Sequence, residues 1–86
     1  MRYEVLIERR AYKQLASLEK HIYEQVVESL RILRDYGFAA RLDIKKLRGY
    51  PNHYRLRVGK YRVLFQLEEA KKIIVYAVLP REKAYE

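Results

Sequence analysis

Residues 50–67, YPNHYRLRVGKYRVLFQL, contain the pattern that decides the fold. The pair Gly59-Lys60, with glycine first, favours a two-residue type II′ hairpin turn. That turn sets a cross-strand register of Val58 with Tyr61, Arg57 with Arg62, Leu56 with Val63, and Tyr54 with Phe65. We therefore expect two antiparallel strands that meet at this turn.

The two faces of this hairpin differ in chemistry, because side chains alternate across a strand. The face expected in the core carries Tyr54, Leu56, Val58, Tyr61, Val63, Phe65 and Leu67. The other face carries His53, Arg55, Arg57, Arg62, Leu64 and Gln66. Two arginines directly opposite each other cost from a few tenths to about 1 kcal/mol. A hairpin that accepts this repulsion is typical of a surface that binds a polyanion.

Positive charge is concentrated in the same part of the chain. The 86 residues include 19 basic and 11 acidic side chains, for a net charge of +8. Residues 41–62 contain eight of the basic residues and only one acidic residue, Asp43, so seven of the eight net charges lie there. A focused positive field indicates a nucleic-acid or other polyanion binder. A merely solubilising surface is the alternative, which evenly scattered lysines would favour.

The remaining elements follow from hydrophobic periodicity. Strands are expected at 2–8, interior to the sheet, at 44–48, and at 72–79, where Pro80 ends a central strand that is apolar on both faces. Helices are expected at 9–18 and 21–36, with Gly37 as the C-terminal glycine of the second. We predict one α+β domain, residues 1–86, with an antiparallel sheet in the order β-α-α-β-β-β. A helical hairpin should pack on one face of the sheet, leaving the other as the working surface.

Composition excludes several classes of protein. The chain has no cysteine, so it contains neither a disulfide framework nor a thiolate metal site. Only two histidines, His21 and His53, are present, and no glycine-rich phosphate loop or HExxH motif occurs. We expect neither a metal nor a cofactor. No apolar run approaches the ~20 residues of a membrane span and no signal peptide is apparent, so we expect a cytosolic protein.

Arginines, tyrosines and one histidine suit metal-free cleavage of RNA. The 2′-hydroxyl of the RNA is itself the nucleophile, so the protein must orient the ribose, neutralise phosphate charge and move protons. Arginine binds phosphate with two parallel hydrogen bonds and stays charged, but it is a poor base. A histidine exchanges protons near neutral pH, and His53 has the same parity as Arg55 and Arg57. The alternative, which the position beside a turn favours, is an ordinary surface histidine.

Residues outside the hairpin complete the candidate site. Tyr50 and Tyr85 lie near basic segments, and either could stack on a base, a contact worth about 1–3 kcal/mol. Arg81 follows the last strand, where it is a site residue or an ordinary solvated charge. Three further cations are interpreted as steering the RNA backbone rather than as chemistry: Lys45, Lys46 and Arg48.

The segments KLRGYPNHYRLRVGKYRVLFQL and IIVYAVLPREKAY resemble the RelE side of the RelE/ParE toxin superfamily, in its archaeal-type branch. The N-terminal strand and helical hairpin fit the same pattern, so the resemblance spans nearly the whole chain. It implies a RelE-like microbial ribonuclease-type fold. It also implies a metal-independent endoribonuclease (an mRNA interferase) that cleaves ribosome-bound mRNA in the A site, leaves a 2′,3′-cyclic phosphate, inhibits translation and is silenced by a cognate antitoxin.

The resemblance assigns the family's site residues to Arg55, Arg57, Arg62, Arg81 and Tyr85. The arginine after the hairpin tyrosine, which stabilises charge on the scissile phosphate, corresponds to Arg62. Well-known bacterial relatives carry lysine where this chain has Arg55 and Arg57. The charge-stabilising role survives that exchange, whereas the identity of the base stays open.

Two other functions remain as alternatives. A ParE-like toxin would use the same fold to poison DNA gyrase without nuclease chemistry, and a plain RNA-binding module would bind RNA without cutting it. Clustered arginines in the hairpin favour the RNA-cleaving hypothesis, because gyrase inhibition requires no phosphate-facing cluster there.

Overall fold

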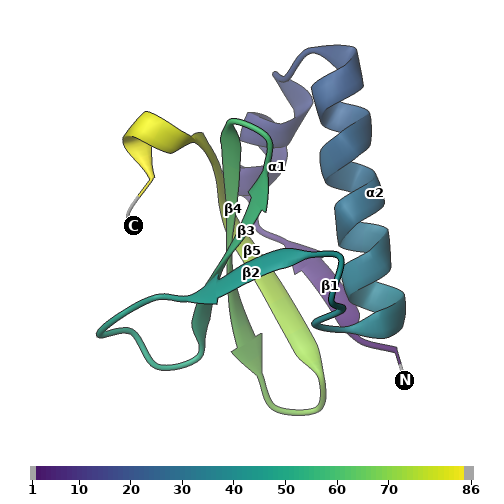
Figure 1. The fold of residues 1–86 in the computed structure, drawn as a ribbon, viewed down its shortest axis with the longest axis vertical. Coiled ribbons are helices and arrows are strands. Elements are labelled where there is room, and N and C mark those ends of the chain that lie inside the picture. The colour runs from purple at the N-terminus through teal and green to yellow at the C-terminus, as the bar shows by residue number, and fades with distance from the viewer. Residues whose placement is uncertain (1, 85–86) are drawn as a thin grey trace.

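A computed structural model describes residues 2–84 and shows a five-stranded sheet with two helices on one side (Figure 1). The elements are β1 (Glu4–Ile7), α1 (Arg9–Ala16), α2 (Lys20–Tyr36), β2 (Asp43–Lys46), β3 (His53–Val58), β4 (Tyr61–Glu68), β5 (Lys72–Pro80) and a short 3₁₀ turn, η1 (Arg81–Lys83). The α+β class, the helical hairpin on one face and the central position of β5 are confirmed. The strand predicted at 44–48 is confirmed as β2 beside the hairpin, so the sheet has five strands, one more than the order β-α-α-β-β-β contains.

The predicted hairpin register is confirmed in full. β3 and β4 pair Val58 with Tyr61 and Arg57 with Arg62, and the other predicted pairs follow. Gly59 has φ 58° and Lys60 has a negative φ, the combination that a type II′ turn requires. The apolar face of the hairpin enters the core, where Leu56, Val63 and Phe65 are fully buried.

The N-terminal strand is the main departure from the predicted sheet. The strand order is β1-β5-β4-β3-β2, so β1 is an edge strand, and the expectation of an interior position is wrong. β1 also runs parallel to β5, which makes the otherwise antiparallel sheet mixed. The apolar run Val5-Leu6-Ile7 has another explanation: Val5 and Ile7 pack on the core, whereas Leu6 is 41% exposed.

The helices bury the stripes that their periodicity predicts. α1 contributes Ala11 and Leu15, and α2 contributes Val26, Leu30 and Leu33. α1 ends at Ala16, so Leu18 lies beyond it, partly buried against the same core. This core occupies one face of the sheet and leaves the face opposite the helices for the basic residues.

An ion-pair cluster ties the N-terminus to the end of α2. Asp35 accepts a hydrogen bond from Nε of Arg34 at 2.8 Å and another from Nη2 of Arg2 at 3.0 Å. The bond from Arg34, with a smaller contribution from Arg2, lowers the pKa of Asp35 to about 2. Gly37 then ends α2 with φ 72° and ψ −143°, a conformation essentially restricted to glycine.

Candidate nucleic-acid interface

The three hairpin arginines share the sheet face opposite the helices, as predicted, but they are not equally exposed. The Arg57 side chain is 53% exposed. Arg55 and Arg62, by contrast, are only 7% and 5% exposed, so the expectation that all three project into solvent is wrong. Leu64, on the same face, is also buried although it lies outside the core cluster. Arg57 is therefore the hairpin arginine most accessible to a ligand.

Arg62 has a local structural role in the turn. Its Nη1 atom donates hydrogen bonds to the backbone carbonyls of Gly59 and Tyr61, both at 3.1 Å. These bonds hold its positive charge against the hairpin turn, across the strand pair from Arg57. Replacing Arg62 would therefore change the turn as well as the charge.

Asp43 offsets the repulsion between the arginines. It lies opposite Arg57 in the β2–β3 register. Its two carboxylate oxygens lie 3.9 Å from Nη1 of Arg55 and 3.8 Å from Nη1 of Arg57. The single acidic residue of the basic segment thus accepts ion pairs from two of its arginines. Sequence reasoning noted Asp43 only as an isolated acid, because its pairing depends on β2 lying beside β3.

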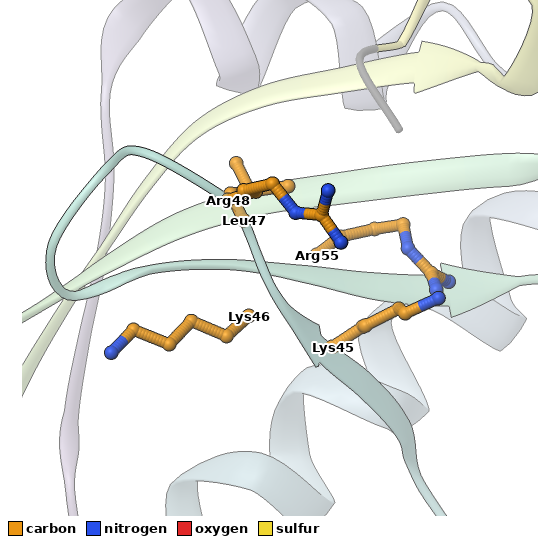
Figure 2. Close-up of a pocket in the computed structure, with 5 residues that line it drawn as sticks. All are labelled: Lys45, Lys46, Leu47, Arg48 and Arg55. Carbon is orange, nitrogen blue, oxygen red and sulfur yellow. The ribbon is translucent and has the colours of Figure 1, made fainter.

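A hollow of about 390 Å³ lies beside β2 and is lined almost entirely by cations. We call it the cation hollow; its residues are Lys45, Lys46, Leu47, Arg48 and Arg55. The cationic ends of Lys45, Arg48 and Arg55 gather on one side, whereas the ammonium group of Lys46 points the opposite way (Figure 2). Three of the predicted RNA-contacting or catalytic cations are thus brought together, and Lys46 is separated from them.

Arg81 lies at the hairpin-turn end of the sheet. It is the exposed first residue of η1, and its backbone N–H donates to the carbonyl of Lys60 at 2.8 Å. That bond places Arg81 next to the turn that Arg62 secures. Tyr85, the other predicted C-terminal site residue, lies outside the described residues.

His53 lies at the other end of β3 and belongs to an aromatic cluster. Its Nδ1 atom is 2.9 Å from the hydroxyl of Tyr76, with which it shares a hydrogen bond. The His53 ring lies 5.3 Å from the Tyr76 ring and 6.0 Å from the Tyr50 ring, measured between centroids. Burial raises the pKa of Tyr76, and the nearby Tyr50 raises it further. Tyr76 could not be identified as a site residue from the sequence, because it lies within an apolar segment that predicts only a strand.

Residues 2–84 contain no group of three or more His, Asp or Glu side chains placed to hold a metal ion. Within the same residues, neither helix combines the length and the apolar character needed to cross a bilayer.

Comparison with protein families and solved structures identifies the chain's relatives. Residues 5–85 match the family described as the ParE toxin of type II toxin-antitoxin systems. The chain belongs to this family. Its similarity to the RelE toxins of archaea places it among the RelE-like members of the RelE/ParE superfamily, which confirms the predicted family.

The RelE-like relatives match over different lengths. A putative toxin RelE1 of Methanocaldococcus jannaschii is 32% identical over 99% of this chain and 97% of the relative. Toxin RelE3 of the same organism is 46% identical, but over only 54% of this chain and 51% of the relative. The RelE structure from the archaeal RelE-RelB complex of Pyrococcus horikoshii OT3 has 33% identity and a TM-score of 0.82, covering 98% of this chain and 100% of that one. The isolated Escherichia coli RelE toxin has 25% identity and a TM-score of 0.77, with 95% and 87% covered.

Proposed function

We propose that this RelE-like toxin is a metal-independent endoribonuclease that cleaves ribosome-bound mRNA in the A site and so inhibits translation. The observation that carries the proposal is the cation hollow together with the exposed Arg57, on the sheet face that the helices leave uncovered. Cations gathered on a rigid sheet bind the phosphates of a single strand without requiring a particular base sequence.

The proposed reaction uses the RNA's own nucleophile. The 2′-hydroxyl oxygen attacks the adjacent phosphorus and loses its proton, the bond from phosphorus to the 5′-oxygen breaks, and that oxygen takes up a proton. The products are a 2′,3′-cyclic phosphate and a 5′-hydroxyl. Negative charge increases on the non-bridging oxygens during this step, and arginines placed beside them would lower the barrier. We assign this role to Arg57, with Arg62 and Arg81 contributing positive charge at the turn end and Arg55 at the hollow. We also assign Tyr85 to the catalytic residues, because the resemblance to the RelE toxins includes it.

The remaining basic residues are assigned to binding. Lys45 and Arg48 would hold the phosphates of the flanking RNA in the cation hollow, and His53, the first residue of β3, would add a further RNA contact. Lys46 also lines the hollow, but its ammonium group points away from the others (Figure 2). We therefore expect Lys46 to contribute less than Lys45 to RNA binding.

Cleavage mapping tests the proposal. The protein is induced under tight control, and the 5′ ends of cellular mRNAs are mapped before and after induction. We expect new ends within translated regions, and we expect Arg57→Gln to reduce them by at least tenfold, since removing one charge-stabilising group typically costs about 10²–10³ in rate. Lys46→Gln makes the same change in net charge and should reduce cleavage far less than Arg57→Gln. Normal growth with no new ends would refute the proposal.

Gyrase poisoning is the second candidate, because the matching family is described by its ParE toxins. It predicts broken DNA and intact mRNA after induction, so the same cultures distinguish the two activities. Binding of RNA with neither DNA breaks nor mRNA ends would leave only an RNA-binding module.

We also propose that a cognate antitoxin binds this toxin in the cytoplasm, where its ribosome-bound substrate lies. Two of the similar structures, from Pyrococcus horikoshii and Methanococcus jannaschii, are complexes of RelE with RelB. An acidic chain wrapped around the domain would complement its charge of +8. A second hollow of about 270 Å³, between the two helices and β1, adds apolar surface with Arg31 and Arg34 at its edge. Purification of the protein alone in a soluble, non-toxic form would count against an antitoxin.

A further inference from the structure

We infer that Tyr50, His53 and Tyr76 form a subsite for one nucleobase of a single-stranded RNA, next to the phosphates held in the cation hollow. We call these three residues the aromatic cluster. The inference deepens the proposed function and rests on its assignment of RNA as the ligand.

A β-bulge places Tyr76 in this cluster. β4 and β5 pair Leu64 with Ala77 and then Phe65 with Val75, which leaves Tyr76 as an extra residue without a partner. Alternation counted forward from Val75 puts Tyr76 on the face opposite the core, whereas alternation counted back from Val78 would put it in the core. The extra residue lets Val75 and Val78 both face the core while Tyr76 lies on the opposite face, bonded to His53. Bulges occur preferentially next to active sites, where they redirect a side chain.

The hydrogen bond between Tyr76 and His53 then fixes the imidazole. The Tyr76 hydroxyl lies 2.9 Å from Nδ1 of His53, and the two rings meet edge to face at 67°. A phenol whose pKa is raised by burial stays protonated and can donate this bond. His53 is thereby held on the same face of β3 as Arg55, two residues away, which is about 6.6–6.8 Å along a strand.

Tyr50 provides an exposed ring at the edge of this arrangement. It is 54% exposed, and backbone hydrogen bonds hold the turn that carries it. The backbone N–H of His53 donates to the carbonyl of Tyr50 at 3.1 Å, and that of Leu67 donates to the carbonyl of Asn52 at 2.8 Å. An exposed aromatic ring on a fixed turn presents stacking surface with little ordering cost.

The position of the cluster relative to the cations decides what it would bind. A hollow of about 270 Å³ lies against Tyr50 and is also lined by Lys46, Leu47, Gly49 and Pro51. It shares Lys46 and Leu47 with the cation hollow, so the two are neighbours. Phosphate-binding cations beside aromatic rings are the combination by which proteins bind single-stranded nucleic acid with little sequence preference.

The test separates base contacts from phosphate contacts. The intact protein is titrated against a 2′-O-methyl oligouridine, which lacks the attacking hydroxyl and cannot be cleaved, and against an abasic chain of the same length. We expect Tyr50→Leu to weaken binding of the oligouridine about 5- to 100-fold, as loss of one stacking ring does. Binding of the abasic chain should not change. Tyr36→Leu is the matched control, because Tyr36 is 69% exposed at the end of α2, away from the cluster.

A second variant tests Tyr76 as a positioning residue. Tyr76→Phe keeps the ring and removes the hydroxyl bonded to His53, and should weaken oligouridine binding about 2- to 10-fold, the usual effect of one hydrogen bond. The NMR signals of the His53 ring give an independent readout. They should shift when the wild-type protein binds oligouridine but not the abasic chain, and this shift should shrink in Tyr76→Phe.

The outcomes distinguish this subsite from the nuclease proposal. If Tyr50→Leu and wild type prefer oligouridine over the abasic chain equally, the subsite is wrong even where mRNA cleavage is observed. If base-dependent binding is lost in Tyr50→Leu but no mRNA is cut in cells, the subsite stands and the nuclease is wrong. Absence of binding to either probe would overturn the subsite, whereas the nuclease proposal is decided by the mRNA ends mapped in cells.

Discussion

The salt dependence of RNA binding distinguishes a built phosphate site from a generally basic surface. Lys45 and Lys46 are neighbours in β2, and both are exposed, so Lys45→Gln and Lys46→Gln make equal changes in net charge. They differ in direction: the ammonium group of Lys45 joins Arg48 and Arg55, whereas that of Lys46 points away (Figure 2). We expect only Lys45→Gln to remove a phosphate contact.

The structure sets the size of the expected effect. Four cations are placed to contact phosphate, namely Lys45, Arg48 and Arg55 in the hollow and the exposed Arg57. Each phosphate neutralised on a single strand contributes about −0.7 to the slope of log K against log salt, so four give about −2.8. Raising the salt concentration about fourfold should then weaken wild-type binding about 50-fold, and the Lys45→Gln variant, with a slope of about −2.1, about 20-fold.

The assay is fluorescence anisotropy of a labelled 2′-O-methyl oligouridine, titrated at several KCl concentrations with each of the three proteins. The Lys46→Gln slope should equal that of wild type, and circular dichroism should confirm that both variants are folded. Equal reductions of slope in the two variants would refute the reasoning, because binding would then follow net charge rather than the placement of the side chains.

Three further predictions concern the fold and the charge of the site. Gly37→Ala should destabilise the protein by at least about 1–3 kcal/mol, because its backbone conformation is restricted to glycine and an added Cβ would lie 2.8 Å from Cε1 of Tyr3. Gly49→Ala, also at positive φ but with no atom within 4 Å of the added Cβ, should cost less in guanidinium denaturation; equal costs would exclude a role for the Tyr3 contact. Arginine hydrogen bonds lower the pKa of Asp35 to about 2, so its stabilising contribution is present above about pH 4 and is lost as the pH falls toward 2. The free energy of unfolding of Asp35→Asn should therefore fall less steeply with acid than that of wild type, and parallel curves would contradict this. Asp43→Asn should tighten RNA binding about threefold by removing a negative charge near the phosphates. Its exposed pair with Arg57 should contribute less than about 1 kcal/mol to stability, whereas its pair with the buried Arg55 should make the total loss larger; weaker anisotropy-measured binding would contradict the assignment.

The hairpin could be predicted from sequence because its signals are local. A glycine-first turn fixes the register, and strict alternation then decides which side chains face the core. One confirmed pairing, Arg57 with Arg62, follows from counting outward from Gly59. The helices were predictable for the same reason, since each has an apolar stripe of its own.

The parallel edge strand could not be predicted in the same way. Pairing of β1 with β5 joins segments about 70 residues apart, as in Leu6 with Ile74, and no turn between them sets a register. The apolar run in β1 indicates a strand but not its neighbours. An edge strand with one face on the core and one exposed leucine has the same composition as an interior strand of this length.

The burial of Arg55 and Arg62 could not be predicted from the sequence either. Alternation assigns both to the basic face, which is correct, but exposure depends on what else lies over that face. The carbonyls of the turn accept hydrogen bonds from Arg62, and Asp43 lies within ion-pair distance of Arg55. Both arginines thus have a positive charge fixed in place by the fold, and removing either would disturb its surroundings. Arg57 is the better residue for a functional test.

The bulge at Tyr76 connects the fold to the candidate site most directly. The extra residue in β5 shifts the alternation of side chains by one position. Ile73 and Val75 therefore face the core before the bulge, and Val78 faces it after the bulge. The core therefore stays continuous, and one aromatic side chain is moved to the basic face without an apolar residue being lost. The sequence KIIVYAVL carries no sign of this, because every residue near the bulge but Tyr76 is apolar and fits either face. A deletion of Ala77 would test the coupling: Val75, Tyr76 and Val78 would then alternate regularly, with both valines in the core and Tyr76 still on the basic face beside His53. We expect that variant to keep the His53 NMR response to oligouridine, whereas Tyr76→Phe should reduce it; loss of the response in the deletion variant would show that the bulge itself positions Tyr76.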